Sequence, residues 1–167
     1  MTPEQRHRCM SRIRSKDTKP EMVVRRWLWA EGYRYRLNLK RLPGKPDIVL
    51  RRFHTVIFVN GCFWHGHEDK SCFRAPKSNV DFWNSKIQRN RERDKRNYLK
   101  LGEMGWNVIV VWECQLAPRC REDTLRAISY KLSKTYLDLQ HRAYEVREDT
   151  VLMVADSEVK YGVGNRG

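Results

Sequence analysis

Apolar residues recur along this chain at helical spacing in three segments. The segment "TKPEMVVRRWLW" opens with helix-start signals, because Thr18 can cap the helix and Glu21 follows three residues later. Its apolar positions keep helical spacing until Gly32, a residue type that ends helices. The same spacing predicts a long helix over residues 79–104 and another over residues 122–137. The apolar stripe of the longer helix is Val80, Trp83, Ile87, Tyr98 and Leu101.

Four shorter segments have the pattern of strands. "YRYRLNL" alternates between apolar and polar residues, like a strand with one buried face. "DIVL" and "TVIFVN" are separated by "RRFH", which predicts a hairpin. Pairing Leu50 with Val56 would set Asp47 opposite Val59. "WNVIVVW" is apolar throughout its middle, as parallel strands covered on both faces tend to be.

The order of these elements predicts a single α/β domain with a central mixed β-sheet flanked by helices. We divide the chain into a basic N-terminal arm (1–17), a central domain (18–137) and a C-terminal extension (138–167) that is partly disordered. Within the extension, "TVLMV" is expected to form an edge strand, and the last residues, "YGVGNRG", are expected to be frayed.

Charge indicates the partner. The chain has 34 Lys and Arg against 20 Asp and Glu, a net charge of +14, so nucleic acid is the natural partner. No apolar stretch reaches the roughly 18 residues that a membrane span needs, and the N-terminus has no apolar secretion signal. The five cysteines are odd in number and cluster near histidines, which favours metal ligation in the cytoplasm over disulfides.

The segment "GCFWHGHEDKSC" carries the strongest metal-ligating pattern. Cys62, His67 and Cys72 lie within it, and Cys114 would emerge close to Cys62 if their two strands are neighbours. Four such ligands around a tetrahedral ion are typical of structural Zn²⁺. His65 is left outside this set, on a loop that a bound metal would hold rigid. The alternative is a group of ordinary buried thiols and surface histidines.

Three acidic residues are candidates for chemistry. Asp47 starts a strand directly after a turn, where it could bind a hard cation or simply cap the turn. Asp94 interrupts the apolar stripe of its own helix, so it is either partly buried at a cleft or paired with a neighbouring cation. Glu21 could be no more than the reciprocal half of the helix cap.

Four motifs occur in the order of a known family: "LPGKPDIV", "VNGCFWHGH", "NRERDKRN" and "GWNVIVVWEC". From Met10 to Leu116 the chain resembles the very-short-patch-repair (Vsr) endonucleases, bacterial enzymes of the wider PD-(D/E)XK nuclease fold. Three departures stand out. "FVN" replaces the (D/E)XK pair, as is typical of this branch, and Asn60 stands where the resemblance leads us to expect a histidine. The spacing between His67 and Cys72 is also longer than in the family.

The resemblance implies a role for each candidate. Asp47 is similar to the aspartate that binds Mg²⁺, with the backbone carbonyl of Val59 as its companion ligand. His65 resembles the histidine that activates the attacking water, since a neutral imidazole accepts a proton near neutral pH. Asp94 resembles the acid that assists this histidine, and Glu21 matches a glutamate near the active site.

The same resemblance implies that aromatic residues wedge into the base stack beside a mismatch. Phe63 and Trp64 occupy these positions, and Met10 and Ile13 match apolar residues of the N-terminal arm that help them. Opening a base step costs a few kcal/mol, and less where pairing is already defective, which provides a route to mismatch preference.

We therefore expect a Mg²⁺-dependent, Zn²⁺-stabilised monomer that nicks duplex DNA 5′ to the thymine of T·G mismatches. Such mismatches arise when 5-methylcytosine deaminates, which implies a link to a cytosine-5 methyltransferase and downstream repair. One alternative is a restriction-type endonuclease that cuts a specific sequence in perfectly paired duplex DNA. Another is a zinc-containing DNA-binding protein without catalysis.

Overall fold

The structure is a computed structural model that describes residues 8, 16–69, 71–73 and 78–158, with side-chain surroundings up to residue 142. Three α-helices and a four-stranded sheet make up the described chain. Within it, no helix combines the length and apolar character needed to cross a bilayer. Most of the N-terminal arm, with Met10 and Ile13, and the frayed end predicted for "YGVGNRG" lie outside the described residues.

Helix α2 (Lys19–Ala30) begins where its capping residues predict. The side-chain oxygen of Thr18 accepts a hydrogen bond from the backbone N–H of Glu21 at 3.4 Å. The helix ends at Ala30, and Gly32 follows with a φ of +82°, a left-handed conformation that glycine adopts without strain. The capping pattern in the sequence therefore predicted both ends of this helix.

The sheet is mixed, with strand order β1-β2-β3-β4. Strands β1 (Arg36–Leu37), β2 (Ile48–Leu50) and β3 (Thr55–Asn60) pair antiparallel, and β3 pairs in parallel with β4 (Asn107–Trp112). This confirms the hairpin and the parallel pair predicted from the sequence. The segment "YRYRLNL" contributes only the two residues of β1, although Tyr33, Tyr35 and Leu37 all pack against the core.

The predicted register of the hairpin is wrong by one residue. Leu50 pairs with Thr55 and not with Val56. The cause is the connection: a short 3-10 helix (Arg51–Phe53) and His54 in the left-handed conformation reverse the chain in four residues, so β3 starts to pair one residue earlier. Asp47 consequently does not stand opposite Val59 in the ladder.

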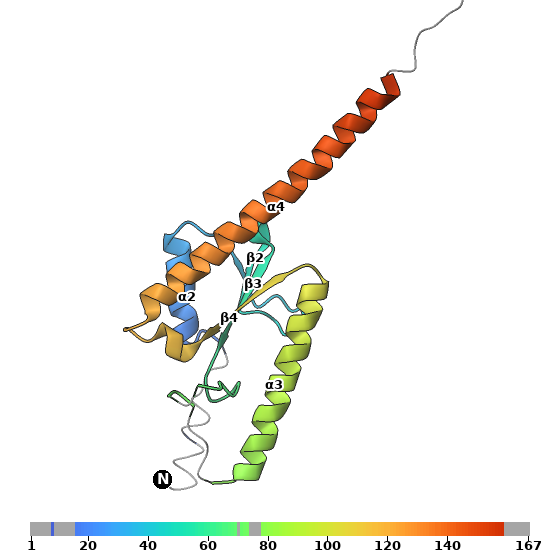
Figure 1. Cartoon of the computed structure of the whole chain (residues 1–167). Coiled ribbons are helices and arrows are strands. Elements are labelled where there is room, and N and C mark those ends of the chain that lie inside the picture. The colour runs from blue at the N-terminus through green and yellow to red at the C-terminus, as the bar shows by residue number, and fades with distance from the viewer. Residues whose placement is uncertain (1–7, 9–15, 70, 74–77, 159–167) are drawn as a thin grey trace, which may run out of the picture.

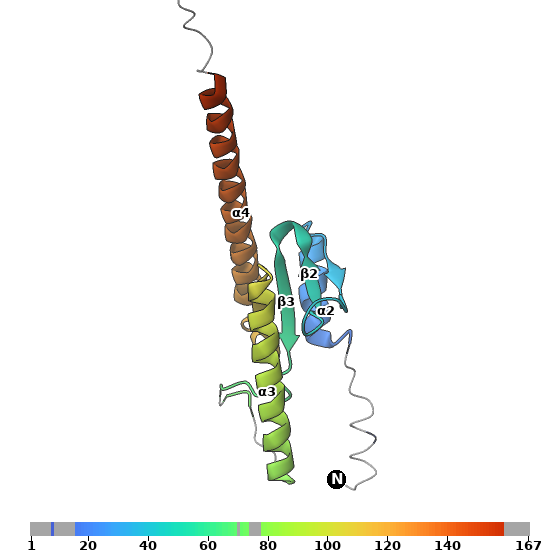
Figure 2. The same ribbon diagram turned by 90° about the vertical axis from the view of Figure 1, so that its right-hand side faces the viewer.

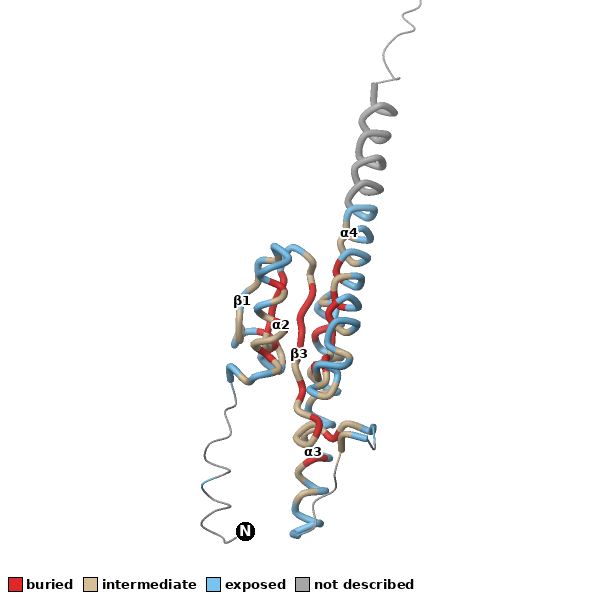
Figure 3. The backbone as a smooth tube through the Cα atoms, turned by 90° about the vertical axis from the view of Figure 1, so that its left-hand side faces the viewer, coloured by how far each residue is buried: buried red, intermediate tan, exposed pale blue. Residues whose placement is uncertain are grey.

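Helices cover both faces of the sheet. Side chains of α2 and of α4 (Arg121–Glu158) share one apolar core with β2, β3 and β4. Leu101 of α3 (Val80–Glu103) packs on the other face, with Val49, Val56 and Phe58. Figure 2 shows β3 between α2 and α3, and Figure 3 shows the buried residues gathered where the helices meet the sheet. The unit β3–α3–β4 is the βαβ unit expected from the sequence.

Helix α4 is longer than predicted and projects away from the sheet and the other helices (Figure 1). The sequence "TVLMV", expected to be an edge strand, lies inside this helix, so that prediction is wrong. A helix satisfies its backbone hydrogen bonds within itself, whereas an edge strand needs a partner strand. These residues directly continue a helix that has already formed, and adding residues to an existing helix is easier than starting a new element.

Candidate functional site

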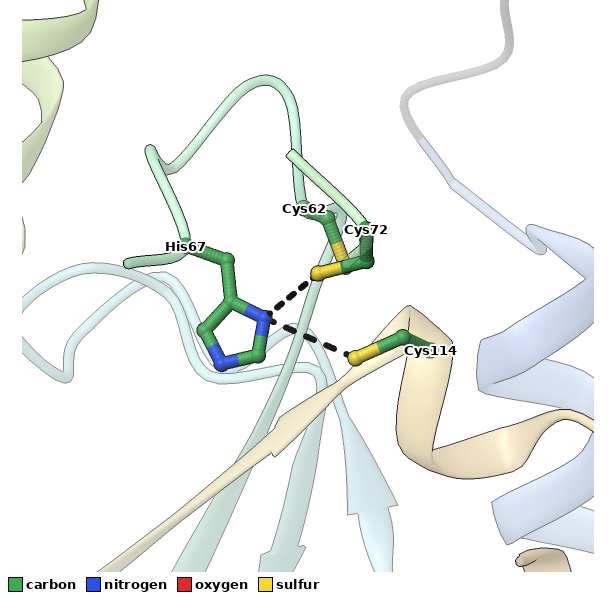
Figure 4. Close-up of side chains that lie close together, drawn as sticks. All are labelled: Cys62, His67, Cys72 and Cys114. Atoms are coloured by element: carbon green, nitrogen blue, oxygen red, sulfur yellow. Dashed lines mark hydrogen bonds between the residues drawn. The ribbon is translucent and has the colours of Figure 1, made fainter. Parts of the chain in front are cut away.

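Four predicted ligands meet at one end of the sheet. Cys62 follows β3, and Cys114 lies in the 3-10 helix (Glu113–Leu116) that follows β4. Because β3 and β4 are parallel neighbours, with Asn60 paired to Trp112, their carboxyl ends deliver the two thiols to the same place. His67 and Cys72 reach it from the intervening loop (Figure 4). We call these four residues the Cys/His cluster.

The geometry of the Cys/His cluster suits a tetrahedral metal ion. One ligand atom from each residue lies within 4.8 Å of the others. Nδ1 of His67 is 3.0 Å from Sγ of Cys72 and 3.5 Å from Sγ of Cys114. Ligands about 2.0–2.3 Å from a shared zinc ion would be separated by comparable distances. The group could therefore hold a metal with small adjustments.

The electrostatics of the cluster lead to the same inference. Burial raises the pKa of Cys62, and burial together with the neighbouring thiols raises the pKa of Cys114 to about 12. Thiols packed this closely are poor acids by themselves, whereas a cation among them would stabilise the thiolates that ligate metals. The ring of His67 also stacks on Trp112, with centroids 4.1 Å apart, so its orientation is fixed.

The loop that carries the cluster is braced on both sides. The backbone N–H of His67 donates to the carbonyl of Cys62 at 2.9 Å, which closes a tight turn. Gly66 has a φ of +60°, and a Cβ there would lie 2.6 Å from a methyl group of Ile87. From α3, Asn90 donates to the carbonyl of Trp64 at 2.9 Å. The loop is thus pressed against α3, and glycine is required where they touch.

A second group of side chains faces a cavity of about 910 Å³ beside this loop. The five residues to which the family resemblance assigned a place at the nuclease site all line it: Glu21, Asp47, Val59, His65 and Asp94. They come from α2, from the residue directly before β2, from β3, from the loop and from α3. We call this space the carboxylate cavity. Tertiary structure brings together residues that are up to 73 positions apart in the sequence.

Asp47 is the most perturbed acid in the carboxylate cavity. Burial, with a further contribution from nearby Glu21, raises its pKa to about 6, although the backbone N–H of Val59 donates to its Oδ2 at 2.8 Å. The N–H and C=O of one strand residue point to the same side, so the Val59 carbonyl also faces the Asp47 side. Asp47 and Val59 thus meet through a side chain, although the register prediction failed.

His65 and Asp94 form a close pair. Nδ1 of His65 lies 2.5 Å from Oδ2 of Asp94. Burial raises the pKa of Asp94, but hydrogen bonds from His65 and Arg93 outweigh it, and the net pKa lies below its ordinary value. An ionised carboxylate can only accept a hydrogen bond, so Nδ1 of His65 is the donor in this contact and Nε2 is the ring nitrogen that Asp94 does not engage.

Glu21 is almost fully buried, with 3% of its surface exposed. Its carboxylate pairs with the Arg25 guanidinium at 3.3 Å, and Arg25 also contacts Asp17 at 2.5 Å. The backbone N–H of Glu21 donates to the side chain of Thr18, which is the capping residue of α2. The carboxylate of Glu21 instead lies between Arg25 and the carboxylate cavity, so its place is at the candidate site rather than in the reciprocal half of the cap.

Aromatic rings gather next to both groups. Phe63 and Trp64 are half-buried and pack edge-on against each other, with centroids 5.3 Å apart. Trp83 of α3 contacts both rings, at 5.3 and 5.8 Å. Sequence reasoning placed Trp83 only in the apolar stripe of its helix. The signal that was missed is the repeated Phe-Trp pair, at 63–64 and again at 82–83.

Comparison with known proteins gives the family. Residues 1–71 match the family described as DNA mismatch endonuclease Vsr. The chain is 50% identical over 131 residues to the Type II nicking enzyme V.NmeAIP of Neisseria meningitidis, covering 76% of this chain and 91% of that protein. It is also 40% identical over 114 residues to the DNA mismatch endonuclease Vsr of Escherichia coli, covering 68% of this chain and 72% of that enzyme.

This chain belongs to the Vsr family. The membership makes it a DNA endonuclease, and DNA is therefore its partner, as the charge of +14 predicted. A third relative, the Type II nicking enzyme V.XorIIP of Xanthomonas oryzae, is 49% identical over 117 residues, covering 70% of this chain and 85% of that protein. The resemblance inferred from the four motifs is confirmed.

Proposed function

We propose that this Vsr-family protein nicks duplex DNA 5′ to the thymine of T·G mismatches produced by deamination of 5-methylcytosine. One observation carries the proposal: a single cavity unites Asp47, Glu21 and the His65–Asp94 pair directly beside the half-buried rings of Phe63 and Trp64. A hydrolytic centre next to partly exposed aromatic rings fits an enzyme that opens the base stack where it cuts.

Hydrolysis of a phosphodiester needs a deprotonated water in line with the phosphorus. In our proposal Nε2 of His65 takes the proton from this water, and Asp94 holds the ring in the correct tautomer and stabilises the imidazolium that forms. Glu21, whose charge is offset by Arg25, supports the same side of the carboxylate cavity.

The carboxylate cavity also fits a catalytic Mg²⁺. The donor set is the one this hard cation prefers, because the carboxylate of Asp47 and the carbonyl of Val59 both offer oxygen. A buried acid with a pKa of about 6 is a group whose charged form a cation would stabilise. When bound, Mg²⁺ supplies charge neutralisation for the phosphate and the leaving oxygen.

In the Cys/His cluster we propose a structural Zn²⁺ bound by Cys62, His67, Cys72 and Cys114. The support is the donor chemistry: three thiols and one imidazole whose ligand atoms lie within 4.8 Å of one another. The imidazole is also held in place by stacking on Trp112. The role of the ion is to brace the loop, so that His65 faces the carboxylate cavity while the aromatic pair is presented to DNA.

Mismatch preference follows from the energy of base opening. Phe63 and Trp64 would wedge beside the mismatch, helped by Met10 and Ile13 of the arm (1–17). The free energy needed to unstack a base step is a few kcal/mol and is smaller where pairing is defective, so a wedge discriminates without reading every base.

We also propose a division of the chain into three parts. These are the arm (1–17), an endonuclease domain of the PD-(D/E)XK type (18–137) and the extension (138–167).

The proposed substrate implies the setting. A nick on one strand of an asymmetric mismatch needs one active site, so we propose a monomer. Deaminated 5-methylcytosine occurs where a cytosine-5 methyltransferase acts, so we propose a functional link to such an enzyme and to repair proteins that process the nick, in the bacterial cytoplasm.

A second candidate is nicking of a specific sequence in perfectly paired DNA. The names of the Neisseria and Xanthomonas relatives, Type II nicking enzymes, favour it. The alternative would use the same carboxylate cavity and would differ only in what the DNA must present.

One experiment separates these functions. Duplexes of identical sequence with a T·G mismatch, a T·A pair or a 5-methylcytosine·G pair are incubated with the protein and Mg²⁺, over a panel of flanking sequences. We expect a single nick 5′ to the mispaired thymine, at a rate about 100-fold above the paired duplexes or more, about 3 kcal/mol of discrimination. Equal nicking of paired DNA would favour the second candidate, and binding without cleavage would favour a non-catalytic protein.

A further inference from the structure

Asn60 is a buried polar residue that the reactions above do not use. Within the described chain only Glu21, Thr55 and Asn60 are buried among the polar and charged residues. Thr55 is explained by its fold, since its hydroxyl donates to the carbonyl of Phe53 at 2.7 Å. Glu21 lines the carboxylate cavity, and so does Asn60, which is 4% exposed.

The position of Asn60 in β3 makes an amide unexpected. Side chains alternate along a strand, so Asn60 lies on the same face as Val56 and Phe58, both of which belong to the apolar core under α3. An apolar residue would continue that core without a penalty. Burying an amide instead costs free energy unless its groups find partners.

One partner is supplied by α3. Nδ2 of Asn60 donates to the hydroxyl of Tyr98 at 3.0 Å. The ring of Tyr98 packs on Phe58, with centroids 5.0 Å apart, so the hydroxyl is held in place. Burial raises the pKa of Tyr98 to about 12, which keeps the hydroxyl protonated at neutral pH. This contact orients the amide and leaves its carbonyl oxygen, Oδ1, without a role in the core.

Asn60 lines two neighbouring cavities, where Oδ1 could accept a hydrogen bond. The carboxylate cavity adjoins a second cavity of about 590 Å³ that lies over α3 and the loop. Three residues line both: Asn60, His65 and Asp94. Asn60 thus lies in the same wall as the catalytic pair, between the two spaces.

The charge of the site explains why an amide suits this wall. Glu21, Asp47, Asp94 and Glu113 already give the carboxylate cavity four carboxylates, and its DNA substrate is also anionic. A carboxamide adds a hydrogen-bond acceptor for water without adding a further negative charge. It also adds no group that titrates near neutral pH.

We infer that Asn60 is a further polar group of the nuclease centre, whose side-chain oxygen accepts a hydrogen bond from the water facing His65. Tyr98 is the positioning residue that orients this amide through Nδ2. The inference rests on the proposed hydrolytic function of the carboxylate cavity and adds two residues to it.

The test is a double-mutant cycle in single-turnover nicking of a T·G duplex. Asn60→Leu keeps the branched shape of the side chain and removes its polar atoms, and Tyr98→Phe removes only the hydroxyl. We expect Asn60→Leu to slow nicking about 30-fold and Tyr98→Phe about 5-fold, the range for removing one preorganised hydrogen bond and for loosening it. The double variant should be no slower than Asn60→Leu, because Tyr98 acts through Asn60.

Controls separate this role from a structural one. The Kd for DNA and the bound zinc should stay within about 2-fold of wild type in each variant, since the water contact matters only in the chemical step. Tyr136→Phe, which removes a surface hydroxyl that bonds Arg52, should nick at the wild-type rate.

Three results would overturn the inference: wild-type nicking by Asn60→Leu, additive losses in the double variant, or a loss confined to DNA affinity. Should Asn60→Leu fail to fold, Tyr98→Phe decides alone, and a wild-type rate for it overturns the inference. A wild-type protein that nicks no duplex would instead contradict the proposed function.

Discussion

The Cys/His cluster and the carboxylate cavity lie at the same end of the sheet and share one loop, yet they are built in opposite ways. The cluster draws all its ligands from one loop and two adjacent strand ends, and its atoms lie within 4.8 Å of one another. The cavity draws its five candidate residues from α2, β3, α3, the loop and the segment before β2, around about 910 Å³ of open space. A closed site suits a structural ion, and an open one suits a substrate.

His65 and His67 make the contrast sharper. They are two residues apart in one loop, yet Nδ1 of His65 faces Asp94, whereas Nδ1 of His67 faces the sulfurs of Cys72 and Cys114. The left-handed backbone of Gly66 lies between them. Residue type therefore does not decide which site a histidine joins, but the path of the loop does.

The largest expected effect is on the cluster. Cys62→Ser should remove stoichiometric zinc and most of the folded protein, because structural zinc binding contributes on the order of 10 kcal/mol in small domains. Metal analysis and thermal unfolding measure both. The matched control is Cys120→Ser, since Cys120 lies outside the cluster and its thiol donates to the backbone carbonyl of Cys114, a bond that a serine hydroxyl can also make. A wild-type protein without zinc, or Cys62→Ser with a full complement, would contradict the prediction.

The second largest effect is expected in the carboxylate cavity. Asp47→Ala should slow nicking about 10³-fold or more, because the loss of a metal-binding carboxylate removes several kcal/mol of transition-state stabilisation. Zinc content and DNA affinity should remain near wild type, as gel-shift titration and metal analysis can check. Asp81→Ala, at an exposed acid in the first turn of α3, is the control and should nick normally. Residual nicking by Asp47→Ala at the control rate would disprove the assignment.

The two histidines provide the third test. His65→Ala should nick about 100-fold more slowly and keep its zinc, which is the scale of general-base catalysis. His67→Ala should lose zinc and stability first, and activity only as a consequence. Zinc content measured alongside single-turnover rates distinguishes the two variants. If both lost zinc equally, the separation of the two sites would be wrong.

The smallest effect concerns stability. Asp47 has its pKa raised from 3.8 to about 6, so folding favours its protonated form. Its contribution is fully present below pH 3.8 and is lost as pH rises through about 6. In magnesium-free buffer, Asp47→Asn should therefore be more stable than wild type by about 2 kcal/mol at pH 8. Near pH 4 the two should be nearly equal.

Urea unfolding of both proteins at the two pH values measures this difference. The comparison cancels the titration of all other groups, since the two chains differ at one residue. An equal gap at pH 4 and pH 8 would show that the carboxylate of Asp47 is not responsible. A protein that is stabilised and inactivated by the same substitution would show that the carboxylate cavity serves function at the expense of stability.

Local signals predicted much of this fold. The capping residues of α2, the glycine that follows it and the apolar periodicity of α3 all act within a few residues, so the elements appear close to where they were predicted. The register of the hairpin and the extent of α4 were wrong. The hairpin register depends on how many residues form the connection between the two strands. The extent of α4 depends on where the helix stops, and apolar periodicity alone does not specify a helix end.

The candidate site divides in the same way. Cys62 and Cys114 could be paired from the sequence, because neighbouring parallel strands end together. The carboxylates were assigned by resemblance, and the structure brings them into one cavity. Trp83 and Tyr98 were taken only as core positions, although they contact the aromatic pair and Asn60. A helix stripe identifies which residues face inward, but not whether they meet core or a site.

The sequence by itself determined the chemistry available to this protein: soft ligands in one loop, scattered acids, adjacent aromatics and a large excess of positive charge. Only the tertiary structure decided which of the two sites each group joins. The packing of the loop on α3 places His65 beside the carboxylate of Asp94 and His67 beside the thiols of the Cys/His cluster. Residue types set which bonds can form, but function depends on distances, and distances are fixed by packing between elements far apart in the chain.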